Sequence, residues 1–289
     1  MTDAALPLAK APARPSRERL VAVALAAPAV LILIFLFALP LAKLLAASLT
    51  GAEGLTFVEY GKLLGTSFYL GVIWNSVRLA LYTTGIALLI GYPAAFALAR
   101  ARGPVRSFLL ACLFLPLAAS VIVKAFAWTI LLRSDGLVNT LLMAVGITAE
   151  PIRMIFTETA LIVGSVNIFL PFMILPVYTV VAQLDPRLSD AAATLGASPV
   201  EAFVRVVVPL TIPGVVAGVA LVFSLAVSAY VVPTLLIGER YPTLSTTIAK
   251  AYLLARQPAF GAAAGVVLLV IAVATVAVSA RLAKLGGAK

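Results

Sequence analysis

The feature that most constrains this chain is a succession of long apolar stretches separated by short charged connections. A helix that crosses a hydrocarbon core of roughly 30 Å needs about 20 residues, because each residue adds about 1.5 Å. Six stretches satisfy this length: 20–42, 79–99, 107–132 (interrupted by Lys124), 159–184, 211–238 and 257–280. The sequence therefore predicts an all-α integral membrane protein with about six transmembrane helices.

Composition supports lipid as the solvent for most of the chain. Of the 289 residues, 63% are hydrophobic and 11% are charged, which is more apolar surface than a soluble domain of this length buries in one core. The net charge of +10 alone would favour nucleic acid, but the basic residues form short clusters between apolar stretches instead of one basic face. We therefore expect a lipid bilayer, and no nucleic acid, as a partner.

Cysteine and histidine usage excludes several kinds of site. The chain has one cysteine, Cys112, inside an apolar stretch, and it has no histidine. A disulfide framework, a Cys/His zinc site and histidine acid–base catalysis are therefore excluded. Cys112 is interpreted as a small buried hydrophobic residue. The sequence predicts no catalytic, cofactor-binding or metal-binding residue in this chain.

Basic residues are unevenly shared between alternate connections, and cytoplasmic connections retain Lys and Arg. The side that holds both termini has twelve, namely Lys10, Arg14, Arg17, Arg19, Arg100, Arg102, Arg106, Arg187, Arg205, Arg281, Lys284 and Lys289. The opposite side has six, namely Lys62, Arg133, Arg153, Arg240, Lys250 and Arg256. This asymmetry predicts that both termini are cytoplasmic. The first stretch is too long and wrongly flanked for a cleaved signal peptide, so we expect it to remain as an anchor.

Three further basic residues, Lys43, Arg78 and Lys124, lie in or beside the apolar stretches. A charge at the bilayer centre costs about 3 kcal/mol on the mildest scale. In the predicted orientation all three lie toward the outer ends of their stretches, where a long side chain can reach the interface. We therefore predict that they snorkel.

Two pairs of glycines have the spacing of a close helix contact. They are Gly214 with Gly218 and Gly261 with Gly265. Small residues four positions apart let two membrane helices approach closely. The pairs predict tight packing and, by themselves, no function.

The connection 185–213 differs from the others because it carries helix-capping residues. Asp185 before Pro186 is typical of an N-cap followed by a first-turn proline, and Gly196 is typical of a helix end. A short helix is therefore predicted before the turn at Gly196 and Ala197.

A second short helix is predicted directly after that turn. Ser198 and Glu201 have the spacing of a capping box, and Pro209 is expected to close the helix. The fifth transmembrane helix is then expected to begin after Pro213.

This connection resembles the EAA loop of ABC importer permeases, in which E-A-A, three residues, G, nine residues and I-x-L-P follow one another. Asp190-Ala191-Ala192, then Gly196, then Val206-x-Val208-Pro209 have these spacings. Aspartate replaces glutamate, and valines replace isoleucine and leucine. The resemblance implies a type I ABC importer permease fold with a cytoplasmic coupling helix between the fourth and fifth transmembrane helices.

In that family the loop docks in a groove of the ATPase subunit, where small residues permit close contact. The resemblance assigns this contact to Asp190, Ala191, Ala192, Gly196, Ala197, Ser198, Phe203 and Pro209. An ordinary cytoplasmic hairpin that binds nothing is the alternative. The chain lacks a G-x-x-x-x-G-K-[ST] phosphate loop, so ATP and Mg²⁺ are expected on partner ATPase subunits.

The resemblance also implies an organisation and a location. We expect a cytoplasmic tail (1–19), an anchor (20–45), a permease core (70–283) that includes the loop 185–213, and a second cytoplasmic tail (284–289). The implied partners are a second permease subunit, expected to be a related chain in a heterodimer, and an external solute-binding protein. The implied location is the bacterial inner membrane.

The segment after the third stretch indicates a subgroup. Residues 124–128 (K-A-F-A-W) and 133–139 (R-S-D-G-L-V-N) look like R-T-Y-A-W and R-x-N-G-L-I-N of spermidine/putrescine-type permeases. The resemblance implies a polyamine or a similar small solute as cargo, and a phosphonate, an opine or an amino-acid derivative stays open. The predicted pathway residues are Trp128, Glu158, Ser224, Ser228 and Tyr230.

Two other classes of function were weighed against a permease. A secondary transporter would use a buried carboxylate or an unwound helix, together with internal repeats. Glu158 is the one acid close to an apolar stretch, and no clear repeat is present. A membrane-embedded enzyme would need an acidic pair or a histidine within the stretches, and the chain has neither.

Overall fold

The computed structural model describes residues 17–51, 54–185 and 187–286, which fall into two units, Met1–Ala46 and Ala47–Lys289. The first unit holds most of helix α1 (Arg17–Leu49), whose part from Ala24 to Leu49 is long and apolar enough to cross a membrane. Lys10, Arg14 and most of the predicted tail 1–19 lie outside the described residues, as do Pro186 and Lys289.

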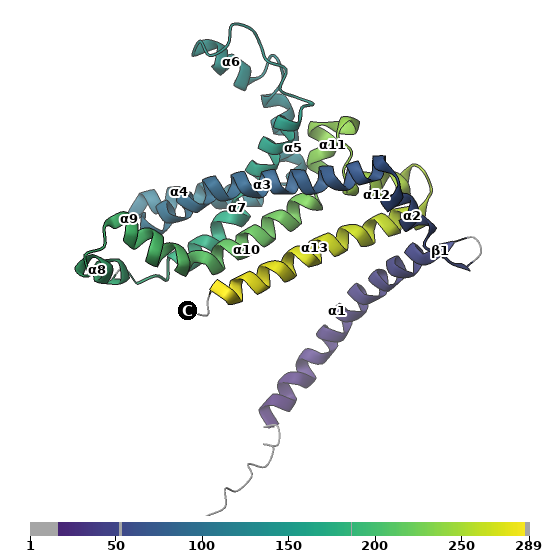
Figure 1. Cartoon of the computed structure of the whole chain (residues 1–289), viewed down its shortest axis with the longest axis horizontal. Helices are drawn as coiled ribbons and strands as arrows, with labels where there is room; N and C mark the ends of the chain where they lie inside the picture. Colours follow the sequence, from purple (N-terminus) through teal and green to yellow (C-terminus); the bar gives the residue numbers. More distant parts are fainter. Residues whose placement is uncertain (1–16, 52–53, 186, 287–289) are drawn as a thin grey trace, which may run out of the picture. The chain divides into compact units, whose positions relative to one another are not determined.

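Four long helices form the bundle of the second unit (Figure 1). They are α3 (Ser67–Arg100), α7 (Glu158–Val181), α10 (Val208–Val227) and α13 (Pro258–Gly286). Helix α7 packs on α3 and α10, and α10 also packs on α3 and α13. Their shared core is apolar and closed to solvent, with Leu79, Leu161, Met173 and Val222 at most 1% exposed.

Shorter elements surround the bundle. They are β1 (Thr50–Gly51), β2 (Gly54–Leu55), α2 (Val58–Gly65), α4 (Gly103–Ala118), α5 (Val121–Leu131), α6 (Leu137–Ala144), α8 (Arg187–Thr194), α9 (Pro199–Ala202), the π-helix η1 (Phe203–Val207), α11 (Val231–Leu236), the 3₁₀ helix η2 (Gly238–Arg240) and α12 (Leu244–Leu253). Strands β1 and β2 pair in an antiparallel hairpin.

The bundle has two distinct ends (Figure 1). Helices α8 and α9 lie at one of them, which we call the Gly196 end. Helices α2 and α12 lie at the other, which we call the Tyr241 end. Helices α5 and α6 extend from the side of the bundle, and α5 packs on α11.

In the described part of the chain, five helices are long and apolar enough to cross a membrane, and α4 with α5 makes a sixth if this bent pair counts as one span. The two helices meet at an angle of 103°. The single third helix predicted over 107–132 is therefore wrong. Ser120 starts a new helix there, because its Oγ accepts a hydrogen bond from the backbone N–H of Ile122 at 3.3 Å.

The predicted fourth and sixth helices match α7 and α13 closely, whereas the fifth begins and ends earlier than predicted, since Pro213 lies inside the helix instead of before it. Helix α10 ends at Val227, well before Gly238, and the chain turns into α11. The hydroxyl of Ser228 donates to the carbonyl of Ser224 at 2.7 Å within the last turn. Hydropathy alone did not reveal this end, because α11 is also apolar.

Pro209 does not close a helix as predicted. Helices α9, η1 and α10 form one continuous run from Pro199 to Val227. Proline disrupts a regular helix because it lacks an N–H and clashes with the carbonyl four residues earlier. Here η1 precedes it as a π turn, in which the N–H of Val208 donates to the carbonyl of Phe203, five positions back. The wider turn lets the helix continue through Pro209.

The predicted close approach at Gly214 and Gly218 is confirmed. A Cβ at Gly214 would lie 2.8 Å from the carbonyl oxygen of Pro176, and one at Gly218 would lie 2.8 Å from Sδ of Met173. Both partners belong to α7, so the glycines set the distance between α7 and α10. Gly261 is also tight, since its Cβ would lie 2.7 Å from the ring of Tyr252.

Cys112 is exposed on α4, so the prediction that it is buried is wrong. Helix α4 packs on the other described elements along a narrow face, with Leu113 as its one buried residue. Its remaining apolar surface suits lipid or another subunit instead of the core of this chain.

Candidate coupling loop and polar network

The turn between α8 and α9 has the geometry that the sequence predicted. Gly196 adopts a left-handed backbone conformation with φ of +86°, which favours glycine. The N–H of Ala197 donates to the carbonyl of Ala192, and the N–H of Gly196 donates to that of Ala193, each at 3.0 Å. These bonds satisfy the last carbonyls of α8 and end the helix. The predicted helix end at Gly196 is confirmed.

The caps at both helix starts are also present. The N–H of Ser198 donates to Oε2 of Glu201 at 3.0 Å, and the N–H of Glu201 donates to Oγ of Ser198 at 3.3 Å. At the start of α8, the N–H of Arg187 donates to Oδ1 of Asp185 at 2.9 Å. The loop is therefore specified locally by its own caps.

The loop presents small and apolar residues to its surroundings. Asp190, Ala191, Gly196, Ser198 and Pro209 are exposed. Ala192 and Ala197 are half-buried. Two large apolar side chains also flank the turn, and sequence analysis did not identify them. Leu195 is 89% exposed and Val200 is 71% exposed. Their apolar character and their position within four residues of Gly196 could have indicated them. Neither residue belongs to the spacing of the EAA loop, so the resemblance did not assign them.

Phe203, which follows this loop, packs against helix α3. Its ring lies 5.6 Å from that of Phe96 and 6.5 Å from that of Tyr92, measured between centroids. The guanidinium of Arg100 lies over the ring of Phe96 at 5.8 Å. Tyr92 also shares a hydrogen bond of 2.9 Å with Thr211 on α10. These contacts link Phe203 to α3, and Tyr92 links α3 to α10.

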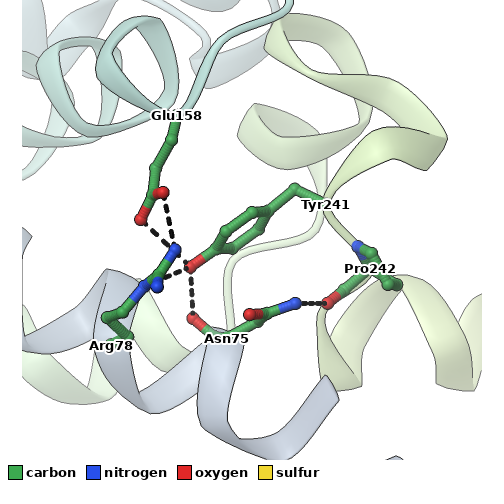
Figure 2. Close-up of polar contacts among 5 residues, drawn as sticks. All are labelled: Asn75, Arg78, Glu158, Tyr241 and Pro242. Carbon is green, nitrogen blue, oxygen red and sulfur yellow. Dashed lines mark hydrogen bonds and ion pairs between the residues drawn. The ribbon is translucent and has the colours of Figure 1, made fainter. Parts of the chain in front are cut away.

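At the Tyr241 end, a polar network joins α3, α7 and the segment after η2 (Figure 2). Nη2 of Arg78 donates to Oε2 of Glu158 at 2.6 Å, and its Nε donates to the hydroxyl of Tyr241 at 3.3 Å. The Tyr241 hydroxyl donates to the carbonyl of Asn75 at 3.1 Å. The side-chain amide of Asn75 donates to the carbonyl of Pro242 at 3.2 Å.

This network changes the interpretation of Arg78. Each side chain of the Arg78–Glu158 pair is 34% exposed, so the charges lie at the edge of the core and compensate each other. Arg78 is thus paired instead of snorkelling alone as predicted. Burial raises the pKa of the Tyr241 hydroxyl, which stays protonated as a hydrogen-bond donor at neutral pH.

The other predicted pathway residues lie on α5 and at the junction of α10 and α11, where Ser224, Ser228 and Tyr230 follow one another. The indole N–H of Trp128 donates to Oδ1 of Asn167 at 3.1 Å. Oγ of Ser224 is buried without a hydrogen-bond partner among the described residues. Tyr230 is 43% exposed and lines a groove beside α12. Of the five candidates, Ser224 and Ser228 are hydrogen-bonded neighbours in the last turn of α10, and the pathway role of all five stays a prediction.

Metal ligands do not cluster in the described part of the chain. Within residues 17–51, 54–185 and 187–286, no group of three or more His, Cys, Asp or Glu side chains is placed to hold a metal ion.

Comparison with known families decides the class of protein. The family described as "Binding-protein-dependent transport system inner membrane component" matches residues 87–284, which is more than half of the chain. The chain belongs to this family. It is therefore a multi-pass membrane permease subunit of an ABC importer, as its resemblance to permeases with an EAA loop implied.

Relatives and solved structures agree with this assignment. The chain is 38% identical over 203 residues to the spermidine/putrescine transport system permease protein PotB of Haemophilus influenzae, covering 70% of this chain and 71% of that protein. It is 36% identical over 216 residues to PotB of Escherichia coli K12, covering 75% and 78%.

The fold resembles that of a solved importer. A chain of a bacterial alginate ABC transporter, solved in complex with an alginate pentasaccharide-bound periplasmic protein, superposes with a TM-score of 0.73 at 17% identity, covering 94% of this chain and 96% of that one. At this identity the likeness supports the fold alone.

Proposed function

We propose that this chain is one permease half of a polyamine importer of the bacterial inner membrane, and that its α8–α9 loop couples the membrane helices to an ATPase subunit. The observation that carries the proposal is the capped turn at Gly196, which projects from the bundle and continues directly into α10. In this assignment the Gly196 end is cytoplasmic, as are both termini, and the Tyr241 end faces outward.

The loop offers a partner subunit a surface of small and apolar residues. Ala191 and Gly196 allow close approach, while Leu195 and Val200 offer apolar surface that water disfavours. Since α9, η1 and α10 are continuous, a displacement of the docked loop moves a transmembrane helix directly. ATP and Mg²⁺ bind to the partner ATPase subunits. The ATPase dimer has a different affinity for each of two permease conformations, so its formation shifts the permease from one conformation to the other.

The complete transporter has further subunits in this proposal. A second permease chain, related to this one, forms the other half of the pathway as a heterodimer. An external binding protein selects the solute and delivers it to the outward-open state, as befits a binding-protein-dependent family.

The proposed cargo is a polyamine such as spermidine or putrescine. Support comes from the curated relatives, which are named as spermidine/putrescine permeases and match most of the chain. The segment from Lys124 to Asn139 carries the corresponding sequence pattern. A phosphonate, an opine or an amino-acid derivative is the alternative cargo, and uptake measurements separate it from a polyamine.

The coupling role is tested with the double variant Ala191→Arg, Ala192→Arg. Two bulky cations on α8 block docking, so we expect the ATPase subunit no longer to co-purify with the permease and solute uptake to be lost. The control is Ala149→Arg, an exposed alanine in the loop after α6, which should retain both. Normal co-purification and uptake by the double variant would overturn the coupling role.

A further inference from the structure

A groove at the Tyr241 end contains the chemistry of an ammonium site. It has a volume of about 320 Å³ and lies among α11, η2 and α12. Its lining includes Tyr230, Thr234, Glu239, Pro242, Lys250 and Leu253. We call it the Glu239 groove.

The side-chain ammonium of Lys250 already lies in this groove. Nζ of Lys250 donates to Oε1 of Glu239 at 2.7 Å. The lysine side chain is a run of methylenes that ends in an ammonium, which is also the chemical pattern at each end of a polyamine. The apolar surface of Leu253, which is 74% exposed, and the half-exposed ring of Tyr230 border the same groove.

We propose that the Glu239 groove is a transient binding site for a terminal ammonium of a linear polyamine, which replaces Lys250 on Glu239 while the methylenes contact the apolar lining. This inference rests on the proposed function and names a place on the outer side where its cargo is met. The exchange leaves the charge of the groove balanced, because Lys250 moves into solvent as the new ammonium arrives.

The groove offers a cation one ionised carboxylate. The Lys250 ammonium donates to the Glu239 carboxylate and holds its pKa below the usual range, so the carboxylate is ionised at neutral pH. The nearby Arg240 is engaged elsewhere, since its guanidinium lies over the ring of Phe156 at 5.8 Å.

The site is suited to brief occupancy. The side chain of Glu239 is 84% exposed, and an ion pair in such a position is weak because water screens it. Lys250 is also a tethered competitor that returns whenever the ligand leaves. A weak site of this kind accepts a solute released by a binding protein without trapping it.

The wall of the groove is held by the polar network. Pro242 lines the groove, and its carbonyl accepts a hydrogen bond from Asn75 on α3. The preceding residue, Tyr241, contacts both Arg78 and Glu158 (Figure 2). An occupant of the groove therefore touches a segment that is bonded to α3 and α7.

The test measures binding without depending on transport. In a Cys112→Ser background, Leu253→Cys places one thiol in the groove of the complete transporter in lipid nanodiscs, and its maleimide labelling rate is followed with and without spermidine. We expect spermidine to slow labelling about threefold at saturation relative to sodium chloride of equal ionic strength, and a thiol at Leu137→Cys on α6 to be unaffected.

Two substitutions make the test specific. Glu239→Gln should abolish the protection, and Lys250→Met should lower the spermidine concentration that gives half of it, because the competitor is gone. The matched control is Lys62→Met, which removes the lysine of another 2.7 Å pair, with Glu59 on α2, and should change nothing. Protection that survives Glu239→Gln, or no protection in a transporter that imports spermidine, would overturn the site while leaving the proposed function intact. A transporter that imports no polyamine would instead refute the proposed function.

Discussion

The distance between α7 and α10 should depend on Gly214 more than on any large side chain. A Cβ at this position would lie 2.8 Å from the carbonyl oxygen of Pro176 and 3.1 Å from Cα of Val177. Both of these atoms belong to the backbone of α7, so no side-chain rotation relieves the clash. Ordinary contact begins at 3.4 Å, so the helices must separate by about 0.6 Å, the difference between 3.4 and 2.8 Å.

The expected loss of stability follows from two opposing effects. Overpacking a close helix contact costs about 1 to 3 kcal/mol, while replacing glycine by alanine inside a helix returns about 1 kcal/mol. Gly214→Ala should therefore lower the free energy of unfolding by about 1 kcal/mol, and Gly214→Val by about 3 kcal/mol, since it adds two more heavy atoms at the contact.

The assay is unfolding of the purified chain in mixed micelles by a denaturing detergent, followed by circular dichroism. The matched control is Gly85→Ala on α3, where a Cβ would meet no atom within 4 Å of this chain. It should leave stability unchanged or raise it by up to about 1 kcal/mol. If Gly214→Ala were as stable as Gly85→Ala, the inferred helix contact would be wrong.

Two further predictions concern polar contacts. In a double-mutant cycle of Arg78→Met and Glu158→Gln, unfolding measurements should give a coupling energy of about 1 kcal/mol, because both side chains are one-third exposed. A coupling energy near zero would contradict a stabilising pair. Buried Asn139 donates to the carbonyls of Arg133 and Ile152 and accepts from the N–H of Ile152. Asn139→Ala should therefore speed amide hydrogen exchange in 145–156, whereas the control Thr140→Ala should not. Equal exchange in both variants would show that Asn139 does not hold that segment.

Residues that act through their neighbours in sequence were predictable. The turn at Gly196, the capping box of Ser198 and Glu201, and the close approach at Gly214 each follow from local spacing or from the small size of one residue. Helices α7 and α13 were also predictable, because they are uninterrupted apolar stretches of sufficient length.

Features that depend on distant partners were not predictable. Hydropathy placed the start of the second helix after Arg78, but α3 begins at Ser67 and includes Arg78, whose charge is compensated by Glu158, 80 positions later. The break between α4 and α5 lies in a stretch that is apolar on both sides, so hydropathy does not register it. Pro209 stays within a helix because the preceding π turn makes room for it, and no sequence pattern marks that turn.

The central claim is that this chain serves an ATP-driven polyamine importer. The most direct measurement is the initial rate of radiolabelled spermidine uptake into proteoliposomes that contain this chain, its second permease subunit and the ATPase subunits, with the binding protein outside and ATP inside. We predict saturable uptake that requires both ATP and the binding protein and that putrescine inhibits. Uptake of a phosphonate or an opine with none of spermidine or putrescine, or spermidine uptake driven by an ion gradient without ATP, would contradict the claim.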